Sequence, residues 1–413
     1  MFKKHVTSLL LFCFSLNAFC VADQAKIDNS ILNLTKANNT FAFELLQREG
    51  GNGENIGFSP YCISSALAMT FAGAANQTLI SMGQVLGFGA LGNTLNPSFS
   101  WLNHDLTTFP SDLPEDFRLY LGNSLWIQKG QKLLPNFLET MNTYYTAGLR
   151  TVDFERQPDA AIAGINSWVN EKTNGKITDL LEVDDSTRFT RMILVSSIYF
   201  KSKWALIFNK KLTTQRPFFA SQDKTLSVPT MANTAYYPYF EHSDFAMIEL
   251  PYIHPSQNAQ EFSMYILLPK QQQGLAEVES LLRAEAFSAW TSSMQSKDIF
   301  LLLPKFKIIS SFSLKNTLSE MGMANAFSLQ ADFSRMTGDK ALKIGDVIHK
   351  AFIAVDESGT EAAAATAVTM MTTSVMNPSQ PLLFKVDHPF VFIITEKMTQ
   401  AILFMGHVQT PGL

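Results

Sequence analysis

Near the end of the chain runs the stretch Glu357-Ser358-Gly359-Thr360-Glu361-Ala362-Ala363-Ala364-Ala365-Thr366, which continues in mostly small residues to Ser374. Side chains of a β-strand alternate between its two faces. If Thr360 faces inward, every second residue after it as far as Thr366 is small and uncharged, and Glu361 faces solvent. The stretch can therefore enter a β-sheet in one register, because a slip of one residue would bury the Glu361 carboxylate.

The four alanines Ala362–Ala365 taken alone favour a helix, since alanine is a good helix former and a poor strand former. Backbone pairing on both edges of an inserted strand outweighs that preference. About a dozen inserted residues would gain on the order of 10 kcal/mol, at about 0.5–1.5 kcal/mol per hydrogen bond. Gly359 can supply the unusual backbone angles of a hinge at the start of the stretch.

The composition is that of an ordinary globular protein. The chain has 413 residues, a net charge of −4 and 46% hydrophobic residues. This balance indicates neither nucleic-acid nor membrane-surface binding. No linker or internal repeat divides the chain, and strand-like runs extend from residues 118–128 to residues 401–408. Early and late strands must share sheets, so we expect one interlocked α+β domain.

The N-terminus has the pattern of a signal peptide. Lys3 and Lys4 precede a short apolar run, Leu9–Leu16, and the small residues of Cys20-Val21-Ala22 follow it. We therefore expect a signal peptide over residues 1–22, a mature chain over 23–413, and a secreted protein that is extracellular, or periplasmic in a bacterium. A lipid anchor at Cys20 is the alternative, and Phe19 disfavours it.

The mature chain would keep a single cysteine, Cys62, so we expect no internal disulfide. Its neighbours predict a buried helix, with Ser59 as N-cap, Pro60 in the first turn and apolar residues on all sides of 60–71. Another amphipathic helix is predicted over residues 28–49. The GxGxxG match at 87–92 follows a helical pattern instead of a strand, which predicts a helix end and loop.

Enzyme motifs are missing from the sequence. It contains no GxSxG, no HExxH and no P-loop, and its histidines lack the spacing of metal ligands. We expect no catalysis and no cofactor or metal, and a hydrolase with an unrecognised site is the remaining alternative.

Several short segments in order along the chain together resemble the serpins, the serine-protease-inhibitor superfamily. The segments are Ser59-Pro60, Ile165-Asn166-x-Trp168-Val169, Tyr199-Phe200-Lys201-x-Lys203-Trp204, Glu249-Leu250-Pro251-Tyr252, Leu303-Pro304-Lys305-Phe306, Ala331-Asp332-Phe333-Ser334, His349-Lys350-Ala351, Asp387-His388-Pro389-Phe390 and Leu403-Phe404-Met405-Gly406. The resemblance implies an α+β serpin fold with three β-sheets, eight or nine helices and an exposed reactive loop at about 357–380.

The resemblance also implies a mechanism. A target protease attacks the loop and forms an acyl-enzyme, and the cut loop then inserts into the main sheet, so that the protein acts as a suicide substrate. The hinge would comprise Glu357, Gly359, Thr360, Glu361, Ala362, Ala363, Ala364, Ala365 and Thr366. Family spacing places the reactive bond between Thr373 and Ser374, with Met371 as an alternative cleavage position.

A β-branched neutral residue at Thr373 favours an elastase-like serine protease as the partner of a monomeric inhibitor. Chymotrypsin- or subtilisin-like proteases are possible targets. A non-inhibitory binding serpin and an inhibitor of a papain-like cysteine protease are the alternatives.

The resemblance further assigns Trp204, His349, Ser59, Cys62 and Ser196 to the regions where the main sheet must part, called the breach and the shutter. Cys62 stands where the family usually has Ser, and Ser196 stands where it usually has Asn. These two departures bear on how readily the sheet opens.

Overall fold

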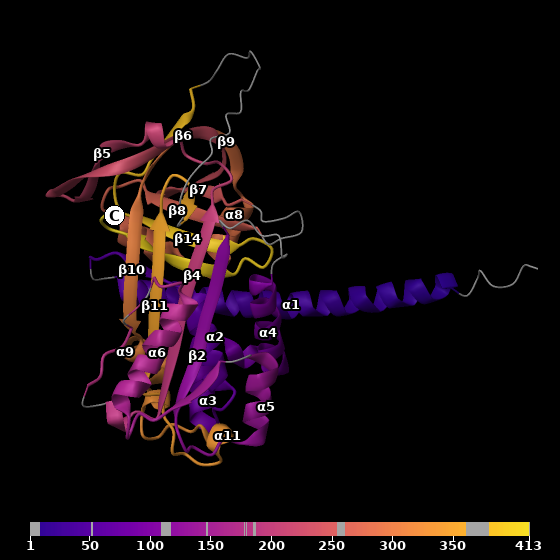
Figure 1. Ribbon diagram of the computed structural model, residues 1–413. Coiled ribbons are helices and arrows are strands. Elements are labelled where there is room, and N and C mark those ends of the chain that lie inside the picture. The colour runs from indigo at the N-terminus through magenta and orange to yellow at the C-terminus, as the bar shows by residue number, and fades with distance from the viewer. Residues whose placement is uncertain are drawn as a thin grey trace, which may run out of the picture.

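The computed structural model describes residues 9–50, 53–108, 117–145, 148–176, 178, 180–184, 187–253, 261–360 and 380–412, and of residues 9–28 it describes only the backbone. Helices and two hydrogen-bonded sheets are interleaved along the chain (Figure 1). The expected α+β class is confirmed.

The central element is a six-stranded sheet. Its strands, in spatial order, are β10 (Phe306–Ser313), β11 (Asp346–Val355), β12 (Gly359–Thr360), β4 (Met192–Lys203), β2 (Arg118–Gln128) and β3 (Leu149–Val152). Strands β4 and β11 also pair directly, in parallel, over Ile193–Tyr199 and Asp346–Phe352. The first nine residues of β4 are buried, as its continuous apolar run predicts.

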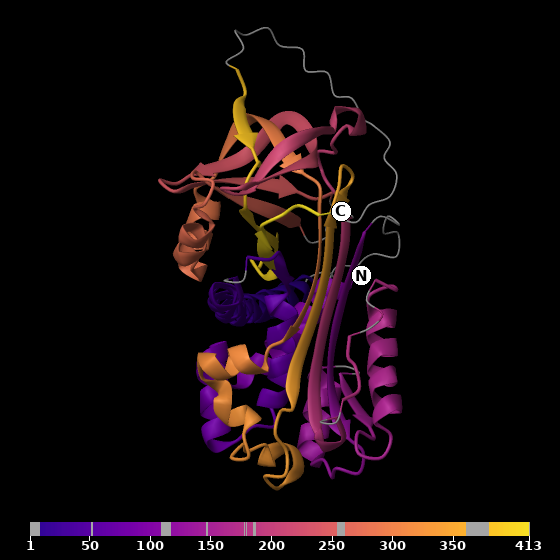
Figure 2. The same cartoon turned by 90° about the vertical axis from the view of Figure 1, so that its left-hand side faces the viewer.

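Helices cover both faces of this sheet. Figure 2 shows the sheet edge-on, with α6 (Pro158–Lys172) on one face and the N-terminal helices, among them α2 (Pro60–Phe71), on the other. Trp168 and Ile165 of α6 pack with Val195 and Ile348 in a small apolar cluster separate from the main core. Strands β4 and β11 are therefore enclosed between α6 and the N-terminal helices.

A second hydrogen-bonded network contains nine strands. Its order is β1 (Ile56–Phe58), β15 (Ile402–Val408), β14 (Phe390–Glu396), β8 (Phe262–Pro269), β7 (Phe245–Pro251), β6 (Lys224–Glu241), β9 (Gln295–Pro304) and β13 (Leu382–Lys385), and β5 (Thr214–Ser221) pairs with β6. We expected three sheets. The expected second and third are continuous because the long strand β6 pairs with β7 at one end and with β9 along Thr230–Tyr239.

Eight helices in the described residues have at least seven residues, in agreement with the predicted eight or nine. They are α1 (Leu9–Glu49), α2, α3 (Asn76–Leu86), α4 (Leu95–Thr107), α5 (Pro135–Tyr144), α6, α7 (Leu275–Leu281) and α8 (Ala284–Ser292); α9 (Lys315–Leu318), α10 (Ala324–Phe327) and α11 (Ser334–Thr337) are single turns.

Local sequence signals explain α2 and α3. The Ser59 side chain accepts a hydrogen bond from the Cys62 N–H, which caps α2, and every α2 residue except Phe71 is buried. Gly87 ends α3 in the left-handed region at φ 69°, so the GxGxxG match begins at a helix end, as predicted. The expected loop after it is instead two short 3-10 turns, Phe88–Ala90 and Gly92–Thr94.

Helix α1 begins well before the predicted residue 28 and is continuous from Leu9 to Glu49. Its N-terminal part projects beyond the body of the fold (Figure 1). In the described portion of the chain, no helix is both long enough and apolar enough to cross a membrane. The signal peptide over residues 1–22 stays a prediction.

Candidate functional site

Two residues of the predicted hinge, Gly359 and Thr360, form a strand within the central sheet. In β12, Thr360 pairs with Val355 of β11 on one side and with Ser202 of β4 on the other. Gly359 pairs with Lys203. The hinge thus begins where β4 and β11 separate, and below this point these two strands pair with each other.

The backbone around Gly359 leaves no room for a side chain. A Cβ at this position would lie 2.0 Å from the Ser202 carbonyl oxygen and 2.6 Å from the Lys203 Cα. Backbone this close excludes every other residue type. The predicted role of Gly359 as a hinge residue therefore has a steric reason as well as a conformational one.

Thr360 faces inward, as the alternation argument requires. Its side chain is fully buried, and its hydroxyl lies 2.7 Å from the Tyr252 hydroxyl. Burial raises the pKa of Tyr252 well above its usual value, and the bond to Thr360 opposes this shift only in part. The Thr360–Tyr252 contact helps to hold β12 in its register between β11 and β4.

Trp204 lies directly beneath the hinge. Its ring stacks on Tyr252 with a centroid distance of 4.6 Å, and its Nε1 donates to the Asp356 carbonyl at 2.9 Å. The Trp204 backbone N–H donates to the Ser358 carbonyl, also at 2.9 Å. Trp204 therefore links β4, β7 and the turn before the hinge.

The carboxylates of Asp356 and Glu357 stabilise the turn that precedes β12. Asp356 Oδ1 accepts from the Ser358 N–H at 2.8 Å, and burial raises the pKa of Asp356. Glu357 is buried and pairs with Lys305 at 3.0 Å. Burial works to raise the pKa of Glu357, but hydrogen bonds from its own backbone, from Lys305 and from Thr213 together hold that pKa below its usual value.

His349 lies under the seam between β11 and β4. Its Nε2 accepts from the Ser59 N–H at 2.9 Å, so the neutral ring carries its proton on Nδ1, which donates to Ser196 Oγ at 2.8 Å. The imidazole is completely buried, and burial lowers its pKa to about 3. Four of the residues that the resemblance assigned to the breach and the shutter thus lie along one seam, namely Trp204, Ser59, Ser196 and His349.

Cys62 is a buried free thiol beside this group, as predicted. Burial raises the pKa of the Cys62 thiol to about 12, so the thiol is protonated and inert as a nucleophile. Its carbonyl accepts at 3.1 Å from Asn123, with the amide oriented so that its oxygen accepts from Ser65 Oγ at 3.2 Å. Asn123 pairs with Ser196 in the β2–β4 register and extends the row of polar groups across the sheet.

Sequence reasoning missed Asn123, Tyr252 and Lys305 as members of the site. Tyr252 and Lys305 belong to segments quoted for the resemblance, but nothing in the sequence pairs them with Thr360 and Glu357. Asn123 was only one position in a predicted strand, and its role follows from its register against Ser196.

The remaining predicted site residues lie outside the described residues. They are Glu361, Ala362, Ala363, Ala364, Ala365 and Thr366 of the hinge and Thr373 and Ser374 of the reactive bond. Among the residues that are described, no group of three or more His, Cys, Asp or Glu side chains is placed to hold a metal ion.

Comparisons with known proteins agree with this architecture. The family model described as "Serpin (serine protease inhibitor)" matches residues 36–411. The chain therefore belongs to the serpin family, whose members are protease inhibitors and typically not enzymes themselves.

Relatives occur in distant organisms. The chain is 38% identical to a leukocyte elastase inhibitor of Xenopus laevis, over 92% of this chain and 100% of that protein. It is 37% identical to an uncharacterised serpin-like protein of Thermococcus kodakarensis, over 92% of this chain and 86% of that protein. Among solved structures, human thyroxine-binding globulin in complex with thyroxine is similar with a TM-score of 0.81 and 30% identity, over 93% of this chain and 100% of that one.

Proposed function

We propose that this serpin is a secreted suicide-substrate inhibitor of an elastase-like serine endopeptidase. The protease cuts the loop between Thr373 and Ser374, the acyl-enzyme forms, and the loop behind the hinge inserts between β4 and β11. The position of Gly359 and Thr360 as β12 carries this proposal, because the loop leaves the sheet at the junction into which it would insert.

Strand pairing supports the direction of this change. Strands β4 and β11 now pair in parallel over seven residues each. An inserted loop would replace this one parallel ladder by two antiparallel ladders, of which β12 is the beginning. Antiparallel pairing is slightly more stable per residue, and the number of ladders doubles. Cleavage frees the loop to form them.

The family and the relatives named as elastase inhibitors support the choice of target. Thr373 suits a small apolar specificity pocket, whereas a trypsin-like pocket requires Lys or Arg. Export through the residue 1–22 signal peptide would bring the inhibitor to extracellular or periplasmic proteases. A monomer suffices for this mechanism.

The test is incubation with pancreatic elastase, followed by a denaturing gel and mass spectrometry of the released peptide. The proposal expects a covalent complex that survives denaturation and a peptide that begins at Ser374. Cleaved protein with no complex would refute inhibition of elastase. A parallel panel of chymotrypsin, subtilisin and papain separates the other targets, including the cysteine-protease alternative.

A non-inhibitory binding serpin is the second candidate, and one observation favours it. Ser196 and His349 are hydrogen-bonded across the β4–β11 seam, which holds the sheet closed. If the seam does not open, cleavage leaves the melting temperature almost unchanged. A large rise in melting temperature after cleavage supports the inhibitor instead.

A further inference from the structure

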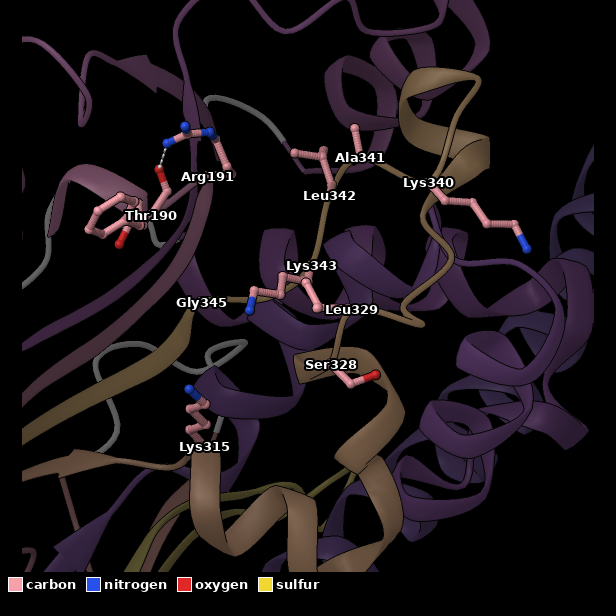
Figure 3. Close-up of a pocket in the computed structure, with 11 residues that line it drawn as sticks. Thr190, Arg191, Lys315, Ser328, Leu329, Lys340, Ala341, Leu342, Lys343 and Gly345 are labelled. Atoms are coloured by element: carbon pink, nitrogen blue, oxygen red, sulfur yellow. Dashed lines mark hydrogen bonds between the residues drawn. The ribbon is translucent and has the colours of Figure 1, made fainter. Parts of the chain in front are cut away.

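A pocket of about 380 Å³ lies at the end of the central sheet where β4 and β11 begin (Figure 3). We propose that this pocket binds an amphiphilic anion. A phosphate, sulfate or carboxylate group would lie between Lys315 and Lys343, and the apolar body of the ligand would lie against Phe189 and Leu329.

The charge of the lining is the first argument. Four of the described residues that line the pocket are cationic, namely Arg191, Lys315, Lys340 and Lys343. The described lining contains no Asp or Glu. The whole chain, in contrast, has a net charge of −4. A positive lining on a negative protein concentrates anions at this place.

Two of these cations are already engaged. Arg191 pairs with Glu155 at 3.4 Å and donates to the carbonyls of Arg188 and Thr190. Lys340 pairs with Asp332 at 3.0 Å, and Figure 3 shows its side chain directed away from the pocket.

The other two cations, Lys315 and Lys343, have no ion pair or side-chain hydrogen bond within the described residues, and both side chains point into the same space (Figure 3). Each ammonium offers three donors, so one anion between them would accept charge-assisted hydrogen bonds from both. The same anion would offset the repulsion between the two lysines.

The apolar part of the ligand follows from two exposed side chains. Of the large apolar side chains in the described residues, Leu329 (86%) and Phe189 (78%) have the greatest exposed fractions, and both line this pocket. A ligand that covered them would remove apolar surface from water. The hollow, at about 380 Å³, has the volume of a small-molecule site.

The position of the pocket lets the bound anion affect loop insertion, an inference that rests on the proposed function. In the inserted loop, we continue the register of β12 without a shift. Loop residues 369–371 would then lie opposite residues 193–191 on the β4 side and opposite residues 346–344 on the β11 side. The inserted loop would thus end beside this pocket. Before insertion, the Gly345 N–H donates to the Met192 carbonyl at 2.8 Å, and this bond closes the β4–β11 seam beside the pocket. An anion bound to Lys343 and near Arg191 would oppose the last part of insertion.

The site is tested with hexyl phosphate, titrated into the uncut protein in a calorimeter. We expect one binding site per chain and at least tenfold weaker binding of inorganic phosphate and of hexanol. The double variant Lys315→Ala/Lys343→Ala should bind hexyl phosphate at least tenfold more weakly. The matched control, Lys210→Ala/Lys224→Ala, removes the same charge from two exposed positions elsewhere and should bind as the wild type does.

Three results would overturn the site. These are unchanged affinity in the Lys315→Ala/Lys343→Ala protein, equal affinity for inorganic phosphate and hexyl phosphate, and binding to phosphatidylserine vesicles without binding to monomeric hexyl phosphate. Calorimetry needs no protease, so failure of the proposed inhibition leaves this test intact. If the wild type forms a covalent complex with elastase, saturating hexyl phosphate should increase the cleaved fraction at the expense of the complex.

Discussion

His349 Nδ1 lies 2.8 Å from Ser196 Oγ and joins β11 to β4 in the part of the central sheet that would open in the proposed mechanism. The imidazole must be neutral, because its Nε2 accepts a hydrogen bond from the Ser59 N–H, and protonation of Nε2 would break that bond. The closed seam is therefore sensitive to pH.

The first prediction concerns acid. Burial lowers the pKa of His349 to about 3, against an ordinary value of 6.5. Above pH 6.5 neither the folded nor the unfolded chain protonates this ring. As the pH falls from 6.5 towards 3, only the unfolded chain takes up the proton, so stability is lost, by about 2 kcal/mol at pH 5.

Urea unfolding at a series of pH values checks this prediction. His349→Asn should remove that component of the pH dependence, whereas His104→Asn, at an exposed position, should retain it. Parallel pH profiles for the wild type and His349→Asn would contradict the assignment.

The second prediction concerns the partner of that histidine. Ser196→Ala leaves the Nδ1–H donor of His349 buried without an acceptor, which should cost about 1–3 kcal/mol of native stability. The melting temperature of the uncut protein should fall. Ser197→Ala serves as control, because the Ser197 hydroxyl makes only a 3.5 Å contact with the Gly122 carbonyl. Equal losses in the two variants would mean that the seam bond has no special role.

The third prediction concerns the close approach at the hinge. Gly359→Ala would place a Cβ 2.0 Å from the Ser202 carbonyl oxygen, so β12 must move out of the sheet. We expect a loss of about 3 kcal/mol and faster hydrogen exchange at the Trp204 N–H, which is bonded to the Ser358 carbonyl. Gly164→Ala in α6, where the new Cβ meets nothing within 4 Å, should not destabilise the protein and should leave exchange at the Trp204 N–H unchanged; the helix preference of Ala should add up to about 1 kcal/mol of stability.

The fourth prediction concerns the inward face of the loop. Thr360→Arg would place a charge where Thr360 is fully buried against Tyr252, so the loop should fail to insert and the protein should become a substrate of its protease. Thr360→Ser keeps the hydroxyl and should keep inhibition. The ratio of covalent complex to cleaved protein on a denaturing gel measures the difference, and a complex of wild-type yield with Thr360→Arg would rule out this register.

Local sequence signals predicted the elements that depend on local physics. The Ser59 cap, the buried helix after Pro60 and the buried strand from Met192 needed only capping preferences and apolar periodicity. The inward direction of Thr360, which is fully buried, was expected because the opposite register would bury the Glu361 carboxylate.

What the sequence could not supply depends on contacts between distant segments. Tyr252 meets Thr360 across 108 residues of chain, and Asn123 joins the shutter only through its register with Ser196. The union of two expected sheets follows from the pairing of one long strand, β6, with both β9 and β7. Helix α1 extends past its predicted start, although the apolar pattern gave a boundary at residue 28.

The indole of Trp204 has an immediate practical consequence. It is 1% exposed, stacked on Tyr252 and bonded to the Asp356 carbonyl at the mouth of the seam. Trp126 and Trp168 lie elsewhere, beneath and on α6, beside the Arg150 guanidinium. The chain has five tryptophans, and the remaining two, Trp101 in α4 and Trp290 in α8, also contribute to the intrinsic fluorescence. The difference between the wild-type stopped-flow trace and that of a Trp204→Phe variant reports on opening at the mouth of the seam. Replacing Trp101 and Trp290 by Phe as well leaves Trp126 and Trp168, which report on displacement of α6.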